Sequence, residues 1–219
     1  MLNLIIKDIL IQKKNFIFGL LYLGFFVFVF QSLGEAMFTG AIVAFVYLLT
    51  SGTFAYDDKN KADIMLNSLP IKRRDIVRAK YISLIVYMIL GTIAFSAISF
   101  IFVILKLPLS IYPITIQAFL GALFAISLMN SIFFPLMFKL GYTRAKVANM
   151  LLFFAFFFGL PLVINNIISK ENNILKSGIF DAINKQSDAV IGFAVLVISI
   201  IILLLSYMLS IKLYKQREF

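Results

Sequence analysis

Residues 57–81 read DDKNKADIMLNSLPIKRRDIVRAKY, and the arrangement of the whole chain follows from them. These 25 positions carry eleven charged side chains, seven of them basic, whereas only 14% of the 219 residues are charged. Long apolar runs precede and follow the segment. It is therefore the one sizeable piece between hydrophobic runs that must lie in water, and we expect the chain to enter a membrane on both sides of it.

The composition is that of an integral membrane protein. Hydrophobic residues make up 62% of the chain and the mean hydropathy is +1.02, whereas soluble domains are about 45–50% apolar. The net charge of +10 does not indicate nucleic-acid binding, because the basic residues stand between apolar runs and no nucleic-acid-binding motif is present. His and Cys are absent, which excludes thiol nucleophiles and Cys/His metal sites. We expect no catalytic residue, cofactor or metal in this chain.

Six apolar stretches are long enough to cross a bilayer, which needs about 20 helical residues. We therefore predict an all-α membrane protein with one transmembrane domain over residues 1–219. The predicted membrane-spanning helices cover residues 16–33, 36–54, 81–105, 114–138, 147–168 and 189–213. The first two are separated only by Gly34-Glu35, which predicts a tight connection.

Residues 1–14 combine apolar side chains with lysines on roughly opposite sides of a helix. We interpret them as an interfacial helix whose lysines face anionic lipid; the alternative is that they simply begin the first span. No short apolar core with a cleavage site follows, so we expect no cleavable signal.

Lys and Arg are distributed unevenly between the two sides of the predicted membrane domain. Sixteen of the 20 lie on one side, in residues 1–14, 57–80, 139–146 and 212–217. The other four lie on the opposite side, in residues 105–113 and 165–188. Because cytoplasmic loops are rich in Lys and Arg, we expect both termini to be cytoplasmic and residues 165–188 to form an extracellular loop.

Residues 57–81 are themselves predicted to be structured. Asp57 and Asp58 are placed to cap a short helix that extends to Asn67, because acidic groups complement the positive end of a helix. Pro70 ends that helix. A second helix is expected to begin near Lys72 and to run into the third span, with Arg73, Arg74, Arg78 and Lys80 at the level of the lipid headgroups.

We interpret this segment as a docking surface for a cytosolic partner. The alternative is that its basic residues only keep the loop inside, but two or three of them would be enough for that purpose. The residues expected to contact the partner are Asp57, Asp58, Lys59, Lys61, Asp63, Ile64, Leu66, Arg73, Arg74 and Arg78.

A substrate path is harder to place. The Phe-rich runs at 25–30 and 153–158 point all round their helices, so some rings face protein and could form an adaptable apolar wall; the alternative is ordinary lipid-facing bulk. Glu35 is expected at the outer rim, as a solvated turn residue or at the exit of a path. The candidate path residues are Phe26, Phe30, Gln31, Glu35, Phe154 and Phe158.

Two features that are absent from the sequence limit the energy sources that the protein could use for transport. No phosphate-binding G-x-x-x-x-G-K-[ST] loop occurs, so we expect that the chain does not hydrolyse ATP by itself. No pair of acidic residues lies inside the predicted spans, which disfavours an ion-coupled carrier.

Residues 67–81, NSLPIKRRDIVRAKY, resemble the signature S-L-P-[VI]-x-[RK]-x-x-[IV]-V-x-x-K-Y of bacterial ABC-2 type permeases, the six-span membrane subunits of type V ABC exporters. The chain is most similar to the small branch that includes the phenol-soluble modulin exporter permeases and peptide self-immunity systems. The resemblance in topology covers the whole chain, and the motif about fifteen residues. Lys72 stands where family members often have Ser or Thr.

The resemblance implies a complex of two permease chains, identical or different, and two copies of a separate ATPase subunit that binds ATP and Mg²⁺. Each permease would rest a coupling helix, here residues 57–67, in a groove of an ATPase subunit. Closure of the ATPase subunits would then switch a central cavity from inward to outward access.

The resemblance also suggests the cargo and the location. Cavity walls in such permeases come chiefly from spans one, two and five, which are rich in Phe here, so amphipathic or antimicrobial peptides or lipid-like compounds are the expected cargo. The expected location is the plasma membrane of a bacterium, and the richness in Ile, Phe, Asn and Lys suggests a low-GC Gram-positive organism. The rival hypotheses are a non-transporting membrane immunity or scaffold protein and an ion-coupled secondary transporter.

Overall fold

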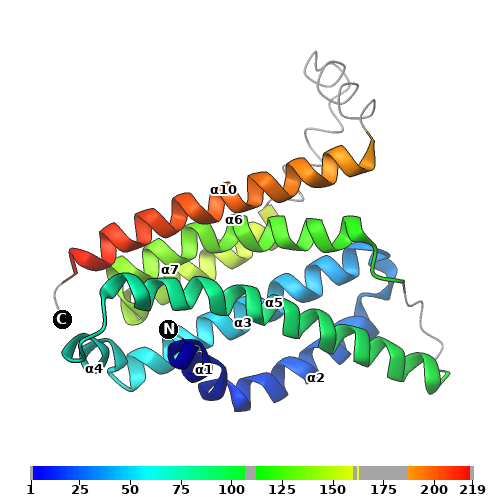
Figure 1. The fold of residues 1–219 in the computed structure, drawn as a ribbon. Coiled ribbons are helices and arrows are strands. Elements are labelled where there is room, and N and C mark those ends of the chain that lie inside the picture. Colours follow the sequence, from blue (N-terminus) through cyan, green and yellow to red (C-terminus); the bar gives the residue numbers. More distant parts are fainter. Residues whose placement is uncertain (1, 107–111, 160–161, 163–186, 218–219) are drawn as a thin grey trace.

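The computed structural model describes residues 2–106, 112–159, 162 and 187–217, and all regular structure in these ranges is helical (Figure 1). The elements are α1 (Leu2–Ile11), α2 (Lys13–Val29), the 3₁₀ turn η1 (Gln31–Leu33), α3 (Ala36–Lys59), α4 (Ala62–Ser68), α5 (Arg73–Ile104), α6 (Ile116–Leu140), α7 (Tyr142–Phe154), the π-helical η2 (Ala155–Gly159) and α10 (Asp188–Lys215). The prediction of an all-α protein is confirmed.

Several of these helices can cross a membrane. Among the described residues, α3, α5, α6 and α10 are each long and apolar enough, and the bent pair α1–α2 makes a fifth span if it is counted as one. The predicted span over 147–168 begins in α7 and continues through η2. The rest of that span and nearly all of the predicted loop 165–188 lie outside the described residues, so the count of six spans stays a prediction.

The connection between α2 and α3 is as tight as expected. α2 ends at Val29, earlier than the predicted end at residue 33, because residues 31–33 form η1. Gly34 follows with φ of +60°, a conformation that favours glycine.

The N-terminal residues form a separate helix. α1 and α2 differ in direction by 62°, and Gln12 at the bend is buried and donates a hydrogen bond of 3.0 Å to Oγ1 of Thr53 in α3. The faces of α1 differ from the expectation, because Asp8 is buried whereas Leu2 and Leu10 are exposed. The position of α1 in the membrane interface stays a prediction.

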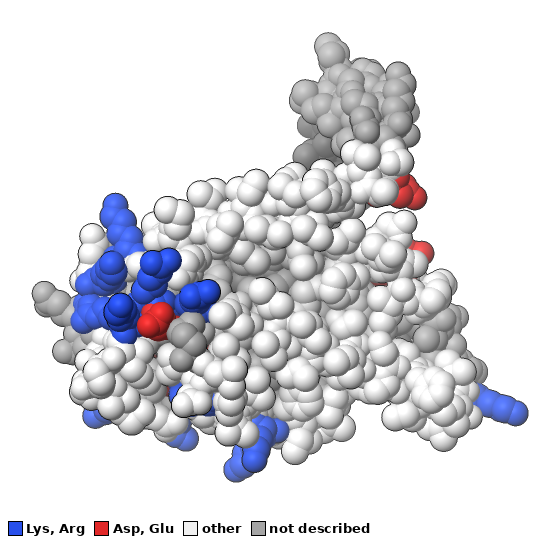
Figure 2. All heavy atoms as spheres, viewed as in Figure 1, with Lys and Arg blue, Asp and Glu red and all other residues white. Residues whose placement is uncertain are grey.

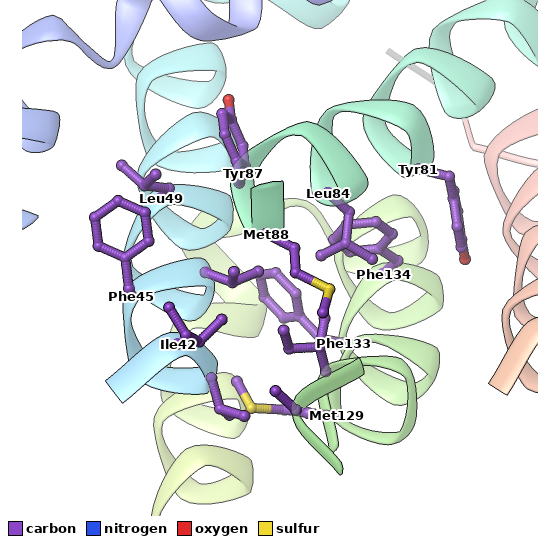
Figure 3. Close-up of a cluster of buried hydrophobic side chains, with 14 of the residues drawn as sticks. Ile42, Phe45, Leu49, Tyr81, Leu84, Tyr87, Met88, Met129, Phe133 and Phe134 are labelled. Atoms are coloured by element: carbon purple, nitrogen blue, oxygen red, sulfur yellow. The ribbon is translucent and has the colours of Figure 1, made fainter. Parts of the chain in front are cut away.

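The apolar core lies where α3, α5 and α6 meet (Figure 3). It includes Ile42, Phe45 and Leu49 of α3, Leu84, Tyr87 and Met88 of α5, and Met129, Phe133 and Phe134 of α6. The Phe45 ring lies between two glycines: a Cβ atom added to Gly19 of α2 or Gly91 of α5 would lie 2.6 or 2.7 Å from it. Such small residues let membrane helices approach closely.

α10 packs along α6 and α5 (Figure 1). The Tyr81 hydroxyl of α5 forms hydrogen bonds with the hydroxyls of Ser206 and Ser210 in α10, at 2.6 and 2.8 Å. Ser206 also donates to the carbonyl oxygen of Ser131 in α6 at 2.9 Å. These bonds fix the three helices against one another near the end of the bundle where α4 lies.

Candidate functional site

Lys and Arg side chains gather at one end of the molecule, over α4, the beginning of α5 and the end of α10 (Figure 2). We call this region the α4 end; it comprises residues 57–80 and 212–217. It contains the whole of the segment predicted to dock a partner, so it is the candidate site.

α4 is a helix of seven residues that is separate from α3. The chain leaves α3 after Lys59 and turns at Lys61, which has the left-handed φ of 49°. Ala62 and Leu66 are buried against the bundle, whereas Ile64 and Met65 are each 56% exposed. α4 therefore presents two apolar side chains to its surroundings at the most charged end of the protein.

The end of α4 and the start of α5 agree with the sequence. Leu69 is extended and precedes Pro70, which is unfavourable for continuing a helix. α5 begins at Arg73 and runs without interruption to Ile104, as the second predicted helix was expected to do. Lys72 occupies the N-cap position, and its side chain makes no capping hydrogen bond.

The prediction that Asp57 and Asp58 cap the docking helix is wrong. Both residues lie in the last turn of α3, because α3 continues to Lys59. An acidic residue is unfavourable at a helix C-terminus, but Asp57 is compensated by two lysines and the Asp58 carboxylate accepts a hydrogen bond of 2.6 Å from Thr143 Oγ1. Asp57 is buried, so this structure does not present it to a partner as expected.

Asp57 belongs to a buried ion cluster of Lys7, Asp8, Asp57 and Lys80. Lys80 Nζ lies 2.9 Å from Asp8 Oδ1 and 2.5 Å from Asp57 Oδ2, and Lys7 Nζ lies 2.8 Å from Asp57 Oδ1. The side chains of Lys80 and Asp8 are only 7% and 1% exposed. Two positive and two negative charges balance, as buried ions require. The cluster joins α1, α3 and α5.

The pairing of these four residues was not predicted from the sequence. The level of Lys80 relative to the lipid headgroups stays a prediction, but its side chain points into the protein, toward Asp8 and Asp57. Two signals were available: Asp8 is the only acidic residue before Glu35, and Lys80 is the last charged residue before an uncharged run that extends to Leu105. Charges at such positions need partners from other helices.

A second polar group fixes α4 to the end of α10. We call it the α4–α10 clamp; it consists of Asp63, Asn67, Arg73, Tyr214 and Arg217. The buried Tyr214 hydroxyl donates to Asp63 Oδ1 at 3.0 Å and accepts from Asn67 Nδ2 at 3.1 Å, while Arg217 lies 3.2 Å from Asp63 Oδ2.

Arg73 completes the clamp. Its Nε donates to Asn67 Oδ1 at 2.9 Å, and its Nη1 donates to the carbonyl oxygens of Tyr214, Lys215 and Arg217 at 3.3, 2.9 and 3.2 Å. The guanidinium group of the first residue of α5 thus joins α4 to the last turn of α10 and to Arg217 just after it. The roles of Asn67, Tyr214 and Arg217 were not predicted.

The ten predicted contact residues therefore fall into three groups. Asp57 and Leu66 are buried, and Asp63 and Arg73 form part of the clamp. The exposed residues are Asp58, Lys59, Lys61, Ile64, Arg74 and Arg78. Met65, which was not predicted, joins Ile64 on the outer side of α4.

The predicted path residues do not form one site in a single chain. Phe26 is buried between the rings of Tyr22 and Phe30, and the exposed Glu35 accepts a hydrogen bond of 3.4 Å from Thr115. Gln31 is half-buried in η1. Phe154 and Phe158 stack on each other and are exposed. α2 packs against α3 and α5, whereas α7 packs against α3 and α6, so the two aromatic groups belong to different helix contacts.

These features define a multi-pass α-helical membrane protein with a structured polar end. The profile of the family described as "ABC-2 family transporter protein" matches residues 3–215. The chain therefore belongs to the ABC-2 transporter family and is a permease of that type. Membership implies an ATPase partner and, typically, a dimeric arrangement. Neither the curated proteins nor the solved structures contain a significant match.

Proposed function

We propose that this protein is the membrane subunit of an exporter and that α4 is the helix on which its ATPase subunit docks. The observation that carries the proposal is the side-chain arrangement of α4. One side of this short helix is buried and clamped, and the other exposes Ile64 and Met65 among charged residues. Burial of these two side chains in a groove of the ATPase would contribute about 2 kcal/mol, or about thirtyfold in affinity.

The connections of α4 are suited to transmit a movement of the ATPase to the membrane helices. A turn at Lys61 joins it to α3, an extended segment joins it to α5, and the clamp joins it to α10. Displacement of α4 by the ATPase would therefore act on three long helices at once, and such rigid-body coupling can switch a cavity between two openings. Asp63 and Arg73 then transmit force within the chain instead of contacting the ATPase.

The remaining features of the complex follow from this assignment. The α4 end and both chain termini face the cytoplasm, in agreement with the excess of Lys and Arg there. Two ATPase subunits bind ATP and Mg²⁺, and this chain is not an enzyme without them. A second permease chain completes the transport path, and the six-span permease lies in the plasma membrane of a bacterium, a low-GC Gram-positive organism by composition.

Amphipathic or antimicrobial peptides, or lipid-like compounds, are the proposed cargo, as for the phenol-soluble modulin branch. Phe30 and Phe158 support it, because these exposed rings, just after α2 and in η2, offer apolar surface to a path shared between two chains. Apolar rings can accommodate cargo of varied shape.

The test is reconstitution of the permease and its ATPase subunit in vesicles with a fluorescent amphipathic peptide. The variant Ile64→Asp/Met65→Asp is expected to insert normally, to lose co-purification of the ATPase and to lose ATP-dependent peptide movement. The matched control Ile64→Val/Met65→Leu keeps the apolar surface and both activities. ATPase binding and transport at the level of the control would show that α4 is not the docking helix.

Two further measurements, one in cells and one in the same vesicles, separate the rival functions. If expression of the protein without any ATPase protected cells against the peptide, this would support an immunity or scaffold protein. Among the residues that the structure describes, the buried cluster around Lys80 is the feature that favours an ion-coupled carrier. Transport driven by a proton or sodium gradient without ATP would support that function.

A further inference from the structure

The basic residues at the start of α5 point in three directions. Arg73 is directed to the end of α10 in the clamp, and Lys80 is buried with Asp8 and Asp57. Arg74 and Arg78, one turn apart on the same face of α5, are exposed. Neither the clamp nor the buried cluster uses these two residues.

Arg74 and Arg78 lie at one end of a groove between α5 and α10. The groove has a volume of about 400 Å³, which is within the range of about 300–1,000 Å³ typical of small-molecule sites. Its lining includes Ile85 of α5 and Ile200 and Leu204 of α10, and it is almost entirely apolar beyond the two arginines and the hydroxyl of Tyr207.

The spacing of the lining residues shows that the groove runs along both helices. Positions 74, 78, 81, 82 and 85 form one stripe of α5, and positions 200, 203, 204 and 207 form one stripe of α10. The charged end coincides with the first two turns of α5, and the apolar part extends toward the middle of the apolar helices. A ligand in this groove would have a charged head at the edge of the membrane and a chain within it.

The charge of the head group follows from the two arginines. Arg74 Nε donates to the Tyr207 hydroxyl at 3.3 Å, which orients its guanidinium at the mouth of the groove. Asp75 is the neighbouring acidic residue on α5, but among residues 2–106, 112–159, 162 and 187–217 no carboxylate forms an ion pair with Arg74 or Arg78. Two adjacent guanidinium groups match the oxygens of a phosphate, to which they can donate several hydrogen bonds.

We propose that this groove binds one anionic phospholipid, with Arg74, Arg78 and Tyr207 around its phosphate and an acyl chain between α5 and α10. The groove is bounded by α10, which is clamped to α4, so a bound lipid would stiffen the contact through which α4 is held. The proposal concerns the permease alone and does not depend on the ATPase or the cargo.

The test is native mass spectrometry of the full chain in detergent, after incubation with equal amounts of phosphatidylglycerol and phosphatidylcholine with identical acyl chains. The wild-type protein is expected to retain one phosphatidylglycerol in preference. Arg74→Gln/Arg78→Gln should lower this preference at least about tenfold, the scale expected for two positive charges at an anionic surface. Arg144→Gln/Lys146→Gln is the control, because it removes two exposed charges from the first two turns of α7.

Two further arms identify the occupant. Leu204→Trp fills the apolar part and should displace the lipid although both arginines remain. Millimolar inorganic phosphate should not compete, because it lacks the acyl chain.

Four outcomes would overturn the proposal. The first three are an unchanged preference for phosphatidylglycerol in the arginine variant, an equal loss of this preference in the control, and full competition by inorganic phosphate. The fourth is a lipid-free dimer of the wild-type protein that dissociates in Leu204→Trp, which would assign the groove to a second copy of the chain.

Discussion

Lys80 Nζ donates a hydrogen bond of 2.9 Å to Oδ1 of Asp8, which lies 72 residues earlier in the chain. The same ammonium group donates to Asp57 Oδ2, so one side chain of α5 holds both α1 and the end of α3. Because Asp57 is only a few residues before α4, the N-terminal helix is fixed to the end of α3 that leads into the proposed docking helix. We infer that α1 stabilises the end of α3, from which α4 moves.

Removal of Lys80 alone should destabilise the protein strongly. Lys80→Met leaves the carboxylates of Asp8 and Asp57 with the half-buried Lys7 as their cationic partner and, on Asp8, a hydrogen bond of 3.3 Å from Ser83 Oγ, and breaking a buried ion pair costs about 3–5 kcal/mol. Thermal unfolding in detergent measures the loss. The exposed Lys61 provides the control Lys61→Met, which should change stability little.

Restoring the charge balance should recover part of this loss. Asp8→Asn/Lys80→Met removes one charge of each sign and is expected to be more stable than Lys80→Met. If Lys80→Met unfolds at the temperature of Lys61→Met, or if the double variant is the less stable one, the cluster does not contribute as described.

The sequence predicted the helical class, the tight connection at Gly34, the break at Pro70 and the start of the long third span. These features depend on local composition and on residues that limit the backbone, which a single chain displays directly. The motif in residues 67–81 also pointed to the family that the profile match establishes.

The pairing of charges could not be predicted in the same way. The local sequence around Asp57 is compatible with a helix cap and with a buried ion. Which role it has depends on Lys7 and Lys80, which only the tertiary structure brings next to it. The local sequence of Tyr214 is likewise compatible with an aromatic residue at the membrane interface, and its hydrogen bonds with Asp63 and Asn67 become evident only in the tertiary structure. Long-range partners, not local preferences, decide such polar residues.

Gly91 should tolerate no larger side chain. A Cβ atom there would lie 2.7 Å from the Phe45 ring, whose other side is closed by Gly19. Gly91→Ala is expected to cost about 1–3 kcal/mol through overpacking, measured as loss of thermal stability. Gly24→Ala is the matched control, because its Cβ would meet only Phe102 at 3.9 Å.

A compensating change makes the test specific. Phe45→Leu shortens the side chain between the two glycines, so Gly91→Ala/Phe45→Leu should be more stable than the sum of the single changes predicts. Strict additivity of the two changes would contradict the close contact.

Tyr214→Phe should separate docking from transport. The change leaves Asp63 and Asn67 without the hydroxyl that joins them to α10, at a cost of about 1–3 kcal/mol. The exposed Ile64 and Met65 remain, so the ATPase should still co-purify while ATP-driven transport falls. Tyr112→Phe, an exposed position outside the α4 end, is the control. Loss of ATPase binding together with transport would mean that the clamp shapes the docking surface itself.

Arg73→Lys should loosen the end of α10 although it keeps the charge. A lysine ammonium lacks the planar fork with which Arg73 reaches Asn67 and three carbonyl oxygens together. Hydrogen exchange of the peptide that contains residues 210–217 is expected to rise about tenfold, which corresponds to about 1.4 kcal/mol of local opening. The neighbouring Lys72 makes no capping hydrogen bond, so Lys72→Gln should leave this exchange unchanged. An equal rise in peptides from α6 would indicate global unfolding, and an unchanged α10 peptide would show that the carbonyls do not need Arg73. A rise confined to this peptide is the result that ties the start of α5 to the end of α10.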